Sequence, residues 1–103
     1  RVSMAFPLKP AELESGRVER VMSIGRAEFF DMLPGAVGLP LVHRGEQVSG
    51  KTWRLTAEEL PALNIGLLSL PRLRVQIEFP SRDGAVMQDF MARFDRHFQR
   101  GGG

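Results

Sequence analysis

The chain of 103 residues contains no cysteine. This absence excludes disulfide bonds, thiolate catalysis, thiolate-bound zinc and iron–sulfur clusters formed by the chain itself. It fits a reducing compartment, and we therefore expect a cytoplasmic protein. Tyrosine is also absent, which removes a common catalytic acid.

Long hydrophobic runs are lacking as well. No stretch of about 18 apolar residues occurs, so the sequence predicts no transmembrane helix. Residues 1–6 are too short and too weakly apolar for the core of a signal peptide. We therefore expect no membrane association. The hydrophobic fraction of 43% and the charged fraction of 25% are typical of a soluble globular protein of one domain.

An excess of one charge is nearly absent. Lys and Arg number 14 against 12 for Asp and Glu, which gives a net charge of +2. Twelve of the basic residues are arginine, but carboxylates are interleaved with them along the chain. A nucleic-acid-binding protein usually concentrates its positive charge on one face. The distribution therefore makes a nucleic-acid partner an unfavoured alternative.

Hydrophobic periodicity predicts both helices and strands. Alternation and turn residues predict extended segments over 17–24, 39–44, 47–49, 52–56, 65–70 and 73–79, with a turn at Gly45-Glu46. Residues 57–63 fit a helical turn or a strand. A short helix over 26–33 is expected to end at Pro34-Gly35, since proline disfavours helical geometry before it.

The last two predicted elements are the clearest. Leu73, Val75, Ile77 and Phe79 alternate with polar residues, which indicates a strand with one buried face. Residues 85–100 form a helix with one apolar stripe, capped by Ser81 or Asp83. The members of the stripe are Val86, Met87, Phe90, Met91, Phe94 and Phe98. This stripe would pack on the strand, so we expect the last helix to be essential for folding.

Together these elements predict an α+β fold. An antiparallel sheet of four to five strands carries a short and a long helix on one face, in the order β-α-β(3–4)-α. Residues 1–15 are expected to form a partly ordered N-terminal arm, and residues 16–100 a single domain. Residues 101–103 are expected to form a flexible glycine tail after the helix stop.

Residue patterns that support catalysis are missing. The two histidines, His43 and His97, are far apart in sequence, and a metal site usually needs three or four ligands. The glycines fit no phosphate-binding fingerprint, and the Ser-Gly pairs at 15–16 and 49–50 lack the pattern of a nucleophile turn. We therefore expect no enzyme, no cofactor and no metal.

Two groups of residues are candidate binding sites. If the sheet curls around the last helix, Trp53, Phe79 and Phe94 would line a cavity for a small hydrophobic ligand. Aromatic residues at this spacing more often form core. Arg54, Arg72 and Arg74 are expected on the solvated sheet face, where they would contact an anion or nucleic acid. The simpler alternative for these arginines is cross-strand pairing with Glu58 or Glu78.

Three functions remain open at this level. The favoured one is a small non-catalytic domain that acts through protein contacts or self-association, such as a homodimer formed through a sheet edge or an apolar surface. The first alternative is a hydrophobic-ligand binder with a cavity between the sheet and the C-terminal helix. The second alternative is a weak nucleic-acid binder that uses the arginine-bearing sheet face.

Overall fold

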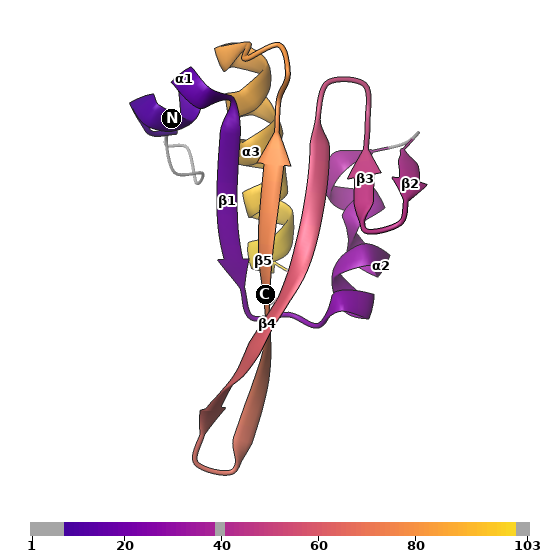
Figure 1. The fold of residues 1–103 in the computed structure, drawn as a ribbon, viewed down its shortest axis with the longest axis vertical. Coiled ribbons are helices and arrows are strands. Elements are labelled where there is room, and N and C mark those ends of the chain that lie inside the picture. Colours follow the sequence, from indigo (N-terminus) through magenta and orange to yellow (C-terminus); the bar gives the residue numbers. More distant parts are fainter. Residues whose placement is uncertain (1–7, 39–40, 101–103) are drawn as a thin grey trace.

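The computed structural model describes residues 8–38 and 41–100, which form one antiparallel sheet and three helices (Figure 1). In chain order the elements are α1 (Pro10–Ser15), β1 (Arg17–Met22), α2 (Arg26–Val37), β2 (Val42–Arg44), β3 (Gln47–Ser49), β4 (Arg54–Ile65), β5 (Leu68–Glu78) and α3 (Gly84–Arg100). The predicted α+β fold with an antiparallel sheet is confirmed.

The five strands are ordered β1-β5-β4-β3-β2, and every neighbouring pair is antiparallel. The central strand pair is β4–β5, and β1 and β2 form the two edges. Helices α2 and α3 lie together behind the sheet in Figure 1 and contact each other. The other sheet face carries no helix among the described residues. One face therefore forms the core, and the opposite face is open to solvent.

Helix α3 closes the core as its stripe predicts. Its start is capped by Asp83, whose Oδ1 accepts hydrogen bonds from the backbone N–H groups of Ala85 at 3.0 Å and Val86 at 3.3 Å. Four stripe residues are fully buried and two are partly buried. The buried ones are Met87, Met91, Phe94 and Phe98. They pack over the inward residues of β5, which include Leu73, Val75 and Ile77.

The predicted end of the first helix at Pro34 is wrong, because α2 continues to Val37. Proline removes one backbone donor and crowds the preceding turn. Burial of Leu33 and Ala36 beside α3 offsets that cost. A Cβ added to Gly35 would lie 2.8 Å from Cε1 of His97, so this glycine permits the close approach of the two helices. The helix ends instead at Gly38, which has φ +79°.

The predicted strand over 65–70 is also wrong. Residues Gly66 and Leu67 form a turn, and Ile65 pairs with Leu68 across it. The ambiguous segment 57–63 belongs to β4, and Pro71 lies inside β5 rather than before it. A single long hairpin therefore replaces the four segments predicted over 52–56, 57–63, 65–70 and 73–79.

The N-terminal segment contains a helix that the sequence analysis did not predict. Helix α1 begins after Lys9, whose backbone N–H donates to Glu12 Oε1 at 2.8 Å. Leu8 is buried and belongs to the core. The predicted flexible glycine tail at 101–103, the first seven residues of the predicted arm and residues 39–40 of the predicted strand lie outside the described residues.

Candidate functional site: the distal β4–β5 hairpin

The far half of the β4–β5 hairpin extends beyond the rest of the domain (Figure 1). The last pair between β1 and β5 is Met22 with Leu73, and the β3–β4 pairing reaches no further along the hairpin than Thr56, opposite Gln47. From residue 60 to residue 72 the two strands therefore pair only with each other. We call residues 60–72 the distal hairpin.

One face of the distal hairpin is aliphatic. Leu63 pairs with Leu70, and Ile65 pairs with Leu68, while Asn64 pairs with Ser69 between them. Side chains of directly opposed residues point to the same face, and successive residues alternate. The two aliphatic pairs consequently share one face, and the polar pair lies on the other. We call Leu63, Ile65, Leu68 and Leu70 the apolar face.

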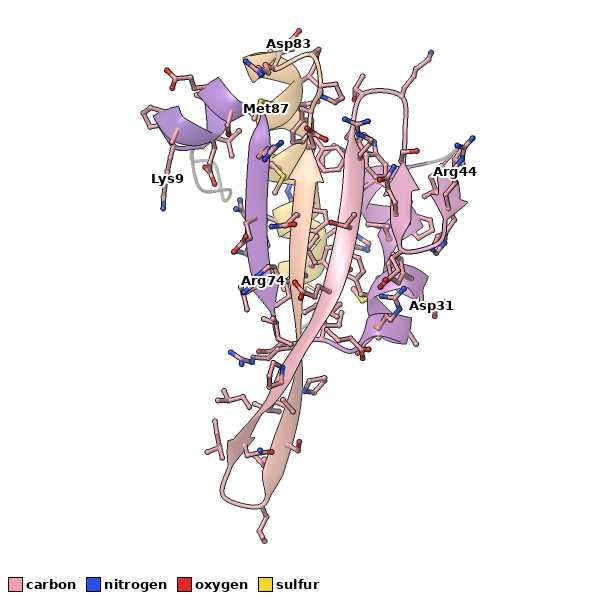
Figure 2. The ribbon with its side chains drawn as sticks, viewed as in Figure 1. Lys9, Asp31, Arg44, Arg74, Asp83 and Met87 are labelled. Atoms are coloured by element: carbon pink, nitrogen blue, oxygen red, sulfur yellow. The ribbon has the colours of Figure 1, made fainter. Side chains whose placement is uncertain are left out.

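The apolar face is open to solvent. Leu63 is 42% exposed, Ile65 55% and Leu68 63%, and Leu67 at the turn is 106% exposed. Among the described residues, the other exposed large aliphatic side chains are Val21 and Val42. Figure 2 shows the side chains of this hairpin projecting with no helix beside them. Leu63, Ile65, Leu67 and Leu68 therefore form the main concentration of exposed aliphatic surface in the described part of the chain, and Leu70 is half-buried.

The base of the distal hairpin contains a bulge. Leu60 pairs with Arg72 and Leu63 with Leu70, so Pro61 and Ala62 together oppose Pro71. Nε of Arg72 donates a hydrogen bond of 3.1 Å to the carbonyl oxygen of Pro61. This bond satisfies a backbone acceptor at the irregular position. Arg72, predicted as an anion contact, thus has a structural partner within the hairpin.

The open sheet face above the distal hairpin carries the other two predicted arginines. Arg54 lies 2.8 Å from Glu78, and Arg74, labelled in Figure 2, lies 3.2 Å from Glu58. Arg74 is also 3.8 Å from Glu19. The cross-strand pairs considered as the simpler alternative are therefore present. The carboxylates offset the positive charge that an anion would need, and the role of the three arginines in binding remains a prediction.

A partly buried ion pair lies on the opposite, helix-covered side of β1. Arg20 Nε and Nη2 donate to Asp95 Oδ1 and Oδ2 at 3.0 and 2.9 Å, and Asp95 is only 8% exposed. This two-point hydrogen bond raises the pKa of Arg20, against the lowering effect of burial. In sequence, Arg20 interrupts the apolar alternation of β1. That interruption signals a charge on the inner face, but it does not identify the partner.

A cleft of about 520 Å³ lies beside this ion pair. Its lining comes from α1, β1 and α3, and includes Val21, Met22, Phe94 and Phe98. Of the three predicted cavity residues, only Phe94 lines this cleft. Trp53 and Phe79 are buried elsewhere, each 5.2 Å from the ring of Phe90 between centroids. A cavity shared by all three rings remains a prediction.

A metal site has no support in the part of the chain that the structure describes. Residues 8–38 and 41–100 contain no group of three or more His, Asp or Glu side chains placed to hold a metal ion. His97 stacks edge-on against Phe98 and lies beside Gly35, whereas Asp95 pairs with Arg20. No described helix has the length and apolar character needed to cross a membrane.

Comparison with known proteins adds no assignment. No protein-family model matches the chain, and no curated protein matches it significantly. The candidate site therefore rests on its own geometry.

Proposed function

We propose that this protein is a non-catalytic domain that acts through protein contacts, with the distal hairpin as the contact element. The observation that carries the proposal is the exposure of the apolar face on a hairpin whose one charged residue, Arg72, lies at its base. Residues 61–71 include no Asp, Glu, Lys or Arg. The chemistry that fits this face is a protein surface of aliphatic side chains.

The free energy of side-chain burial favours a role of the apolar face in protein contact over a role in folding. Complete burial of one large aliphatic side chain is worth about 1.5–3 kcal/mol. The distal hairpin leaves a large part of this free energy unused, because Leu63, Ile65 and Leu68 stay 42%, 55% and 63% exposed. An isolated two-stranded hairpin is only marginally stable in water. A partner that covers the apolar face would supply the missing burial.

Photo-crosslinking tests the proposal. A benzophenone amino acid is placed at Leu67, at the fully exposed turn, or at Ser69 on the polar face as a matched control. The full chain is then irradiated in purified form and in the cells that produce it. We expect discrete protein adducts from position 67 and few from position 69. Equal yields from both positions, or no adducts from either, would contradict the proposal.

A small hydrophobic ligand is the second candidate, supported by the cleft beside β1. Its volume lies within the usual range of about 300–1,000 Å³ for ligand pockets. Binding of an environment-sensitive hydrophobic dye separates the two sites. Loss of dye binding in Met22→Lys, with binding retained in Leu68→Lys, would assign the dye to the cleft. The reverse pattern would assign it to the distal hairpin.

Nucleic-acid binding through Arg54, Arg72 and Arg74 is the remaining alternative. It would require these arginines to leave Glu78, the Pro61 carbonyl and Glu58. A mobility-shift assay at low salt tests it, because attraction to phosphate is strongest there. Absence of binding at low salt would eliminate this alternative.

A further inference from the structure

The apolar face also indicates what kind of protein covers it, an inference that rests on the proposed function. We propose that the partner is a second copy of this chain. In this arrangement the apolar faces of two distal hairpins pack against each other around a twofold axis. Such an interface uses the same patch on both copies, so the patch must be complementary to itself.

The charge distribution of the distal hairpin allows the apolar face to be complementary to its own copy. Since residues 61–71 are uncharged, packing two copies brings no like charges together. At the base, Glu58 pairs with Arg74 on this face, Arg72 follows on β5, and Glu19 lies 3.8 Å from Arg74. Two acids, Glu19 and Glu58, and two bases, Arg72 and Arg74, therefore lie on the sheet face next to the apolar face and form its border. A balanced border can pair with its own copy, whereas a strongly acidic or basic partner would require a border of one sign.

The same features disfavour a lipid surface. Binding to anionic lipid headgroups requires an excess of Lys and Arg, but Arg74 is already paired with Glu58 at 3.2 Å. Asn64 and Ser69 make the second face polar. Both outer edges of the distal hairpin also carry backbone groups without a neighbouring strand, and hydrocarbon cannot satisfy them. Contact through one face, with the other face in water, fits a protein partner.

The proline residues favour packing by faces over pairing by edges. Exposed edges of a hairpin can add strands from another copy. Here Pro61 and Pro71 each lack a backbone N–H, and they lie at the bulge that opens the distal hairpin. Edge pairing would therefore be interrupted at the base of the hairpin. Packing between the apolar faces does not need these donors.

The size of the contact predicts its strength. An aliphatic side chain removes about 60–120 Å² from water when it is fully buried. The apolar face and Leu67 of two copies would thus bury at most about 1,200 Å² together, the lower end of the range for stable interfaces. We therefore expect a weak dimer, with a dissociation constant on the order of 10–1,000 µM.

Sedimentation equilibrium of the full chain tests the proposal from about 10 µM to about 1 mM. The weight-average mass should rise from 11.5 kDa toward twice that value. In Leu68→Lys, which places a charge on the apolar face, the mass should stay at 11.5 kDa. Ser69→Lys is the matched control: it adds the same charge to the neighbouring residue on the polar face and should associate as the native chain does. Thermal melts of both variants verify folding.

Four outcomes would overturn the proposal in different ways. A native chain that stays monomeric, while crosslinks to other proteins form at position 67, would reject self-association but leave the proposed function standing. A monomer with no crosslinks would reject both. A dimer unaffected by Leu68→Lys would assign the contact to another surface. Binding of the monomer to phosphatidylserine vesicles, lost in Leu68→Lys, would assign the apolar face to lipid.

Discussion

The two halves of the β4–β5 hairpin use aliphatic residues in opposite ways. In the half within the sheet, Leu55, Leu73 and Val75 are completely buried beneath the helices. In the distal half, Leu68 on the same strand as Leu73 is 63% exposed. Both halves alternate along β5 but in opposite phase, because Leu68 and Leu70 share a face with Arg72 and Arg74, opposite the face of Leu73 and Val75. The difference is whether a helix covers the face, which decides whether an aliphatic residue contributes to folding or is available to a partner.

The largest effect should come from removing a core side chain of the covered half. Phe94→Ala is expected to lower the free energy of unfolding by about 3–5 kcal/mol. Phe94 is 1% exposed and packs on Phe98 with ring centroids 4.7 Å apart. Denaturant unfolding measures the change. A near-neutral result would mean that the stripe of α3 does not form the core.

Two leucines on β5, Leu73 and Leu68, allow the covered half and the distal half to be compared with the same substitution. Leu73→Ala should cost about 2–5 kcal/mol, since Leu73 is completely buried. Leu68→Ala should change the free energy of unfolding by less than about 0.5 kcal/mol, when measured on dilute monomer. The residue type, strand and substitution are the same in both variants. Equal losses at the two positions would show that the distal hairpin belongs to the folded core.

A smaller loss of stability is expected from a substitution at Gly16, which connects α1 to β1. Gly16 has φ +74°, its carbonyl accepts a hydrogen bond of 2.7 Å from the N–H of Phe79, and an added Cβ would lie 2.8 Å from the Phe79 carbonyl oxygen. Gly16→Ala should therefore destabilise by about 1–3 kcal/mol. Gly25→Ala is the control, because nothing lies within 4 Å of its added Cβ. Similar melting temperatures for the two variants would contradict this reasoning.

A further small effect concerns the ion pair at the margin of the core. A double-mutant cycle with Arg20→Gln and Asp95→Asn should give a coupling free energy of about 1–2 kcal/mol. The two-point geometry and the burial of Asp95 favour a measurable value, whereas partial exposure of Arg20 reduces it. The paired surface residues Arg54 and Glu78 should couple more weakly. A coupling free energy of zero between Arg20 and Asp95 would show that this ion pair does not contribute to the stability of the fold.

Much of the covered half could be predicted from sequence because local and tertiary signals agree there. The stripe of α3, the alternation of β5 and the cap at Asp83 all correspond to what the structure shows. The Gly45-Glu46 turn was also predicted, and Gly45 has φ +60°. Each of these elements depends on a single packing or hydrogen-bonding partner. That partner is close in the chain or is an element directly packed against it.

The errors occur where a local signal competes with packing. Pro34 is a helix breaker in sequence, but burial of Leu33 and the close approach of His97 to Gly35 extend α2 past it. Gly66 lies inside the segment 65–70, which the apolar run predicts as one strand. In the structure it has φ +60° and begins a turn, as Gly45 does. The segment around it lacked the usual polar turn residues, so its apolar character concealed the turn.

The candidate site was harder to predict than the fold. An exposed apolar surface or sheet edge is expected from the sequence, but residues 65–70 are predicted there as one strand rather than as the two sides of a turn. Their exposure depends on where β1, β3 and the helices end, which is not encoded within the segment itself. The pairs Leu63 with Leu70 and Ile65 with Leu68 become recognisable as one face only when the register is known.

Amide hydrogen exchange along β4 and β5, measured at low and high protein concentration, tests the central claim most directly. In dilute solution residues 73–78 should exchange slowly through global unfolding, while residues 68–70 exchange much faster through local opening. At high concentration only the distal hairpin should gain protection. Two results would contradict this expectation. One is protection at 68–70 equal to that at 73–78 in dilute solution, and the other is protection of the distal hairpin that does not change with concentration.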